Sequence, residues 1–179
     1  MLYVASRASH IRNFHLPYLK YYHDEGWTIH VLAEGAKNIA WSDRCIDIPF
    51  EKKLTSWKNW RTIGQIYRLL QAEKYQVISV HTTLAAFLTR IAVRFYGTNN
   101  VKTINTSHGY LFSEKTPPIK RTFYVAAEKL CRPATQLLLV MSEEDYRRAQ
   151  RYNLSAGTIA LIPGMGLPEQ AKPAASAQT

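Results

Sequence analysis

Three histidines stand at or just after the ends of predicted strands, where a parallel sheet would bring them together. His10 follows the first predicted strand, His81 closes the fourth, and His108 comes just after the fifth. In open α/β sheets, ligands bind outside the carboxyl ends of the strands, near the point where strand order reverses. If the fourth strand lies between the first and the fifth, the three imidazoles face one crevice.

The residues beside these histidines are hydrogen-bonding groups and not acids. Arg12 and Asn13 follow His10, and Thr82 follows His81. The acidic residues that accompany histidines at metal sites are missing here, so no metal is expected. Imidazole, hydroxyl, amide and guanidinium groups suit a polyhydroxyl or phosphorylated ligand. For each histidine taken alone, a structural hydrogen-bonded role is the alternative.

Gly109 directly follows His108 and favours a turn with positive φ, which would direct the imidazole into the crevice. A plain turn glycine is the alternative. The segment 6–13 after the first strand contains no glycine, so the dinucleotide fingerprint is absent and a nicotinamide role is not favoured.

Short apolar segments alternate along the chain with amphipathic ones. Parallel strands need crossovers, and each crossover helix covers one face of the sheet. The predicted fold is therefore α/β, a Rossmann-like doubly wound and mostly parallel sheet of about seven strands with helices on both faces. Strands are predicted at residues 1–6, 27–33, 46–50, 76–81, 101–106, 136–141 and 158–162, and helices at 11–23, 57–73, 84–96, 119–130 and 143–152.

The 179 residues, 46% of them hydrophobic, fit one domain, assigned to residues 1–167. Residues 168–179 are rich in Pro, Ala and Ser and are predicted to be a disordered tail. No apolar run reaches the roughly 18 residues of a membrane span, and the first residues do not resemble a signal peptide, so a cytoplasmic location is expected. Cys45 and Cys131 are predicted to be buried free thiols.

A net charge of +10 favours an anionic partner, and one predicted helix carries a basic face. In helix 57–73, the apolar stripe of Trp60, Ile63, Tyr67 and Leu70 is predicted to face the core. The opposite face suits an anionic membrane surface, with a solvated helix face as the alternative. The predicted membrane or anion-binding residues are Lys52, Lys53, Trp57, Lys58, Arg61 and Arg68. Nucleic acid is not expected, because no recognition motif accompanies the charge.

Glu128 lies four residues before Arg132, a spacing that predicts a surface ion pair on one helix.

Several segments, taken in their order along the chain, together resemble the N-terminal domain of family 4 glycosyltransferases, particularly the bacterial capsular and exopolysaccharide type. They extend over nearly all of residues 1–167. The segments are SRASHIRNFHLPYL, SVHTTLAAFLTRIAVR, INTSHGYLF, AAEKLCRPATQLLLVMSEEDYRRAQRYNL and IALIPGMGL.

The resemblance implies one half of a GT-B arrangement, in which two Rossmann-like domains face each other across a cleft. It implies a retaining, metal-independent transfer, with the acceptor held by the N-terminal domain and the nucleotide sugar by the C-terminal domain. It also implies that His108 and Gly109 border the reacting sugar, with His108 as the catalytic candidate. The acceptor-binding residues that it implies are His10, Arg12, Asn13, His81, Thr82 and Gly109.

A complete enzyme of this family is about twice as long, so the resemblance implies that the donor-binding domain is absent and that this chain alone is inactive. No cofactor is expected in this chain itself, and a nucleotide sugar is the donor expected for the complete enzyme. The partners expected are a separate donor-binding chain or a second copy, a lipid-linked sugar acceptor, and the inner face of the plasma membrane. The alternative is a non-catalytic membrane-recruitment or interaction module derived from such an enzyme.

Overall fold

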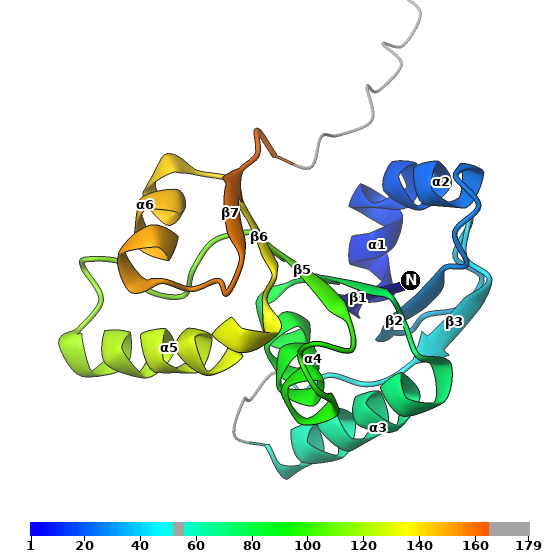
Figure 1. The fold of residues 1–179 in the computed structure, drawn as a ribbon, viewed down its shortest axis with the longest axis horizontal. Coiled ribbons are helices and arrows are strands. Elements are labelled where there is room, and N and C mark those ends of the chain that lie inside the picture. The colour runs from blue at the N-terminus through cyan, green and yellow to red at the C-terminus, as the bar shows by residue number, and fades with distance from the viewer. Residues whose placement is uncertain (52–55, 165–179) are drawn as a thin grey trace, which may run out of the picture.

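The computed structural model describes residues 1–51 and 56–164 (Figure 1). Within them, seven strands form one parallel sheet of order β3-β2-β1-β4-β5-β6-β7. The strands are β1 (Leu2–Arg7), β2 (His30–Glu34), β3 (Arg44–Asp47), β4 (Val77–His81), β5 (Lys102–Ser107), β6 (Leu137–Val140) and β7 (Thr158–Leu161). The helices are α1 (Ala8–Phe14), α2 (Leu16–Asp24), α3 (Trp57–Glu73), α4 (Thr83–Tyr96), α5 (Pro118–Cys131) and α6 (Glu143–Tyr152), with a short 3₁₀ turn, η1 (Arg132–Ala134).

The predicted fold class is confirmed, including the placement of β4 between β1 and β5. Two sets of predictions lie outside the described residues. One is the predicted tail with the end of the predicted domain at residue 167, and the other is the pair Lys52 and Lys53.

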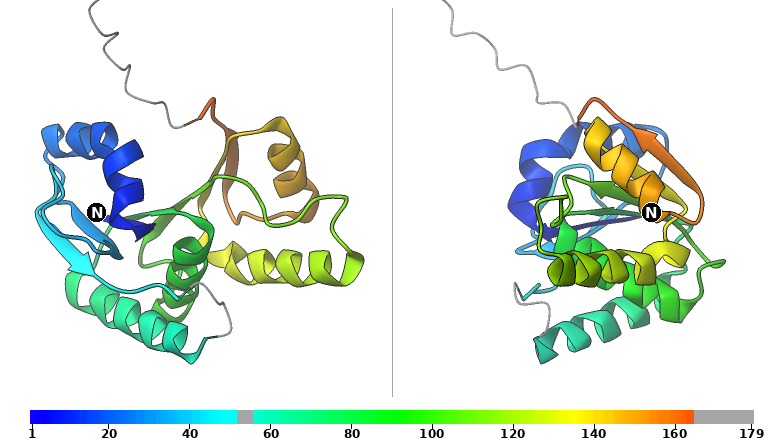
Figure 2. Two further views of the ribbon diagram at one scale, coloured as in Figure 1. Left: turned by 180° about the vertical axis from the view of Figure 1, so that it is seen from behind. Right: turned by 90° about the vertical axis from the view of Figure 1, so that its left-hand side faces the viewer.

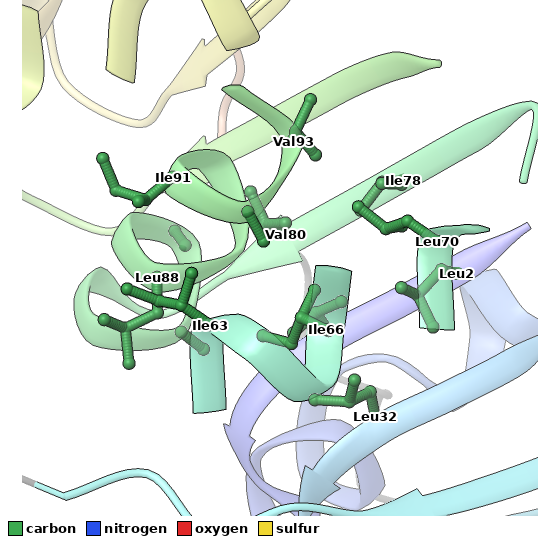
Figure 3. Close-up of a cluster of buried hydrophobic side chains, with 14 of the residues drawn as sticks. Leu2, Leu32, Ile63, Ile66, Leu70, Ile78, Val80, Leu88, Ile91 and Val93 are labelled. Carbon is green, nitrogen blue, oxygen red and sulfur yellow. The ribbon is translucent and has the colours of Figure 1, made fainter. Parts of the chain in front are cut away.

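Successive residues of β1 point to opposite faces of the sheet, and this alternation places them in two of the three core clusters. Leu2 and Val4 pack in a cluster with α3 and α4, whereas Tyr3 and Ala5 pack in a second cluster with α1 and α2. Figure 3 shows the first cluster, where residues of α3 such as Ile66 lie against those of α4 and the central strands. Figure 2 shows the same layers from two further sides.

The described residues cover one face of the sheet only in part. Next to α2, the central strands present half-buried side chains, among them Ile104, Leu137 and Leu139, to a groove of about 370 Å³. Parallel sheets are normally covered on both faces, so this groove is apolar surface that the described helices leave accessible.

The predicted helix 11–23 is wrong in form, because the structure has two helices there, α1 and α2, which meet at His15. Pro17 lies in the first turn of α2, where a missing N–H costs nothing, and it disfavours continuation of the helix from α1. The side chain of His15 is thereby buried at the junction. The third strand was also misplaced, since β3 begins two residues earlier than predicted, at Arg44.

The predicted core stripe of α3 is wrong at Trp60, which is 67% exposed. The buried positions of α3 include Asn59 and Thr62 instead. Asn59 donates to and accepts from the Glu51 backbone, and the Thr62 hydroxyl donates to the Pro49 carbonyl at 3.1 Å. These bonds hold α3 to the segment after β3, and they rotate Trp60 toward solvent.

Two smaller predictions are confirmed. The Ser142 hydroxyl accepts from the Asp145 backbone N–H and caps α6, and both cysteines are free. Cys131 is buried as predicted, but the predicted burial of Cys45 is wrong, because that residue is half-buried. Burial raises the pKa of the Cys131 thiol to about 11. Among the described residues, no helix is both long and apolar enough to cross a membrane.

Glu128 does not form the predicted pair with Arg132. It binds the guanidinium of Arg90 on α4 with two hydrogen bonds, of 2.9 and 3.2 Å. The side chain of Arg90 is only 1% exposed. Burial alone would lower the pKa of Arg90, but the adjacent Glu128 outweighs it and raises that pKa, so Arg90 stays charged. A buried charge needs its partner, and the pair joins α4 to α5.

Replacing Glu128 with Gln should therefore lower the free energy of unfolding by about 3–5 kcal/mol, because a buried guanidinium loses its counter-charge. Glu114→Gln is the matched control, since it removes an exposed pair with Arg151 at 3.4 Å and should cost less than about 1 kcal/mol. Urea denaturation measures both values. Equal effects of the two variants would show that the buried pair has no special weight.

Candidate functional site

Four imidazoles meet at the carboxyl ends of β1, β4 and β5, and we call His10, His15, His81 and His108 the histidine cluster. The ring centroids of His15 and His81 lie 4.2 Å apart, those of His10 and His15 4.9 Å, and those of His10 and His108 5.1 Å. The predicted convergence of His10, His81 and His108 is thus seen in the structure. His15 was missed, because the prediction ran one helix straight through it.

Tyr3, on β1, contacts two imidazoles of the cluster, and this was not predicted from the sequence. Its ring stacks on His81 at 4.6 Å, and its hydroxyl is 2.9 Å from Nδ1 of His15. The Ser79 hydroxyl lies 2.9 Å from Nε2 of His81. Tyr3 and Ser79 are inward-facing strand residues, so only the pairing of β1 with β4 brings them beneath the imidazoles.

The cluster combines two buried imidazoles with two accessible ones. His15 and His81 are 0% and 2% exposed, whereas His10 is half-buried and His108 is exposed. Burial and the neighbouring imidazoles His10 and His108 lower the pKa of His15 to about 3. Burial lowers the pKa of His81 well below its usual value and also lowers the pKa values of His10 and His108. All four are therefore neutral at pH 7, each with one donor and one acceptor nitrogen.

Gly109 adopts the predicted positive φ, at 123°, in the turn that follows β5. No atom lies within 4 Å of the position that a Cβ would occupy, so the backbone conformation and not crowding favours glycine here. The turn leaves His108 in contact with His10 on one side and lining a cavity of about 130 Å³ on the other. Among the residues that line this cavity are Thr82, Phe87, Asn105, Leu111 and Tyr124.

Thr82 joins the ends of two neighbouring strands. Its hydroxyl accepts from the Ser6 backbone N–H at 2.9 Å and lies 2.7 Å from the Ser6 hydroxyl. Its φ of 65° is uncommon for a β-branched residue, and such strain persists only where the surroundings impose it. Thr82 therefore lines the cavity and also fixes the distance between β1 and β4.

The other two predicted acceptor-binding residues are not brought into the cluster by any contact in the structure. The guanidinium of Arg12 donates to the Lys37 carbonyl at 2.6 Å, so it binds the segment after β2. Asn13 is exposed on the same helix. Arg12 lies two residues after His10 in α1, and side chains at that spacing do not share a face of the helix.

The predicted basic face of α3 is exposed; its cations are Lys58, Arg61 and Arg68. The guanidinium of Arg61 lies 4.8 Å from the centre of the Trp57 ring, and Trp57 is 62% exposed. Lys58 pairs with Glu51 at 3.1 Å. An indole and basic groups thus share a solvent-facing surface, to which Trp60 also belongs.

The buried imidazoles predict a stability that depends on pH. An unfolded histidine titrates near pH 6.5, so between about pH 6.5 and 3 the unfolded chain binds a proton that folded His15 does not. Stability therefore falls as pH is lowered through this window, by up to about 1.4 kcal/mol per pH unit for this residue.

The variant His15→Asn should flatten the pH dependence by about one proton, since asparagine cannot titrate. Urea unfolding between pH 7.5 and 5 measures this slope. His23→Asn removes an exposed imidazole outside the cluster and is the control. An unchanged slope in His15→Asn would contradict a neutral, buried His15.

Comparison with known proteins agrees with the resemblance drawn from the sequence. The chain is 29% identical over 167 residues to EpsD of Bacillus subtilis (strain 168), named as a glycosyltransferase; the match spans 93% of this chain and 44% of EpsD. Over 88 residues it is 28% identical to the Escherichia coli UDP-Gal:alpha-D-GlcNAc-diphosphoundecaprenol alpha-1,3-galactosyltransferase, spanning 49% of this chain and 22% of that protein. The chain thus spans less than half the length of these curated relatives.

A solved structure with a similar fold is that of a sucrose-phosphate synthase from Thermosynechococcus elongatus. The TM-score is 0.63 at 13% identity, with 92% of this chain and 88% of that chain covered. In sequence, residues 18–165 match the model of Glycosyltransferase Family 4. Since this match extends over most of its length, the chain belongs to glycosyltransferase family 4.

Proposed function

We propose that this chain is the acceptor-binding half of a retaining glycosyltransferase that acts on a lipid-linked or polysaccharide acceptor and works with a donor-binding half. The observation that carries the proposal is the family 4 match over residues 18–165, together with coverage of only 44% of EpsD. A nucleotide sugar is the donor, held by the other half. The product belongs to a capsule or exopolysaccharide.

The acceptor site is proposed at His108, which borders both the histidine cluster and the 130 Å³ cavity. A neutral imidazole offers one donor and one acceptor to sugar hydroxyls, and the turn at Gly109 gives a ligand close approach. His10 and Thr82 border the same edge. The buried His81 acts through contacts that position its neighbours.

A lipid-linked acceptor is favoured by two features. Apolar side chains such as Phe87 and Leu111 line the cavity beside His108. The Escherichia coli relative is named for transfer to GlcNAc-diphosphoundecaprenol, a sugar linked to a lipid through diphosphate. The net charge of +10 suits a ligand that carries diphosphate.

A separate donor-binding chain, or a second copy of this chain, is the proposed partner. The half-covered sheet face, with Ile104, Leu137 and Leu139 in a 370 Å³ groove, is apolar surface that such a partner can bury.

The direct test is sugar transfer to a lipid-linked acceptor, with this chain assayed alone and then together with a donor-binding half. No turnover is expected from the chain alone. In the combined reaction, His108→Ala should lower kcat by roughly 100- to 1,000-fold if the imidazole stabilises charge at the reacting sugar.

His23→Ala should leave transfer unchanged, because His23 lies outside the histidine cluster. Full activity of the isolated chain would contradict the need for a donor half. Unaltered kcat in His108→Ala would remove His108 from the reaction.

A second candidate is a non-catalytic module recruited to the inner face of the plasma membrane, favoured by α3. Trp57 and Trp60 are 62% and 67% exposed beside the cations Lys58, Arg61 and Arg68. Indole rings and basic side chains together suit an anionic headgroup layer, where each cation contributes about 1 kcal/mol. Both candidates place the protein in the cytoplasm at the membrane, and they differ in whether His108 matters.

Charge reversal on α3, Lys58→Glu with Arg61→Glu, should therefore weaken binding to vesicles that contain phosphatidylserine by at least about tenfold, since two contacts are lost. Lys37→Glu with Arg147→Glu changes the net charge equally on exposed residues elsewhere and is the matched control. Co-sedimentation measures the effect. Equal loss in both double variants would show that overall charge, and not the α3 surface, determines binding.

A further inference from the structure

Three members of the histidine cluster have the arrangement of a metal site. One ring nitrogen from each of His10, His15 and His108 lies within 4.8 Å of the other two. Zinc ligands at about 2.0–2.1 Å in tetrahedral geometry are roughly 3.3 Å apart, so modest side-chain rotation brings the three nitrogens into range. His10 comes from α1, His15 from the α1–α2 junction and His108 from the loop after β5, so the fold and not local spacing assembles the set.

Two buried imidazole nitrogens without hydrogen-bond partners indicate that a ligand can bind between these histidines. Within the described residues, Nε2 of His10 and Nε2 of His15 are buried and have no hydrogen-bond partner. His15 is 0% exposed, and leaving its nitrogen unpaired in that environment costs free energy. A bound cation would satisfy both atoms at once.

The second shell also fits. The hydroxyl of Tyr3 lies 2.9 Å from Nδ1 of His15 and can accept from an Nδ1–H. That tautomer leaves the lone pair of Nε2 free for a ligand bond, and metal-bound histidines commonly have their other ring nitrogen fixed in this way. No metal is expected from the sequence, because acidic partners are missing from these loops. In the structure, the hydroxyl of Tyr3 takes the place of such an acid.

We propose that His10, His15 and His108 bind one divalent transition-metal ion, Zn²⁺ in particular, with the fourth coordination position open to water or an oxygen ligand. Three neutral imidazoles with an open position are a known zinc-binding set. The exposed His108 places the open side toward solvent, next to the 130 Å³ cavity. Since His108 is shared with the proposed acceptor site, an ion bound there would compete with an acceptor for its imidazole.

Untagged chain, stripped with a chelator and dialysed, tests the proposal by Zn²⁺ titration against a chromophoric chelator. One ion per chain is expected. His10→Ala and His108→Ala should each weaken binding by more than roughly tenfold, and Tyr3→Phe by roughly 10- to 100-fold through the lost second-shell bond. His108 is exposed, so His108→Ala should fold, which circular dichroism checks.

Two controls exclude other sites. His23→Ala removes an exposed imidazole, and Cys45→Ser removes the more accessible thiol. Both should retain one bound ion. Substitution of Co²⁺ should give the intense visible absorption of a tetrahedral site in wild type and not in His108→Ala.

The proposal is overturned if wild type binds no Zn²⁺, if the cluster variants bind it as tightly as wild type, or if binding is lost in Cys45→Ser. Each of these outcomes leaves the transferase proposal standing, because sugar transfer is measured separately and the proposed reaction does not depend on the ion.

Discussion

Parallel pairing of β4 with β1 on one side and with β5 on the other is the constraint on which the site depends. It brings the ends of three strands that are far apart in sequence to one edge. Thr82 then ties the end of β4 to Ser6, at the cost of an uncommon backbone conformation. The buried pair of Arg90 and Glu128 fixes the neighbouring helices α4 and α5, which enclose the cavity beside His108.

Strand order and the histidines at strand ends were predictable from the sequence, because apolar runs and crossover helices leave few topologies. Side-chain orientation was not. Asn59 of α3, and not Trp60, is buried because its side chain forms hydrogen bonds with the Glu51 backbone. The apolar periodicity of the helix carries no information about these bonds. The partner of Glu128 proved to be Arg90, 38 residues away, because a buried guanidinium needs a counter-charge more than a surface pair needs Arg132. The role of His15 was missed because it depends on a break between two helices, and Pro17 is the sequence signal for that break.

His108 connects the two environments of the site. On one side lie neutral imidazoles held by burial and by Tyr3, and on the other lies an apolar cavity. Neutral hydrogen-bonding groups beside apolar surface suit the proposed sugar attached to a lipid, and the excess of basic residues suits the phosphates of such a ligand. The chain belongs to glycosyltransferase family 4, and the proposed acceptor site rests on that membership together with this combination of groups.

Histidine side-chain NMR of the chain, titrated with a short-chain prenyl-diphosphate sugar, tests most directly whether the histidine cluster binds an acceptor. We predict that the imidazole signals of His108 and His10 shift with saturable dependence on ligand, while those of His23 and His30 stay constant. A prenyl diphosphate without the sugar should shift them less, because it lacks the hydroxyls. Unchanged cluster signals, or equal shifts of all six histidines, would contradict the assignment of the acceptor site to this edge of the sheet.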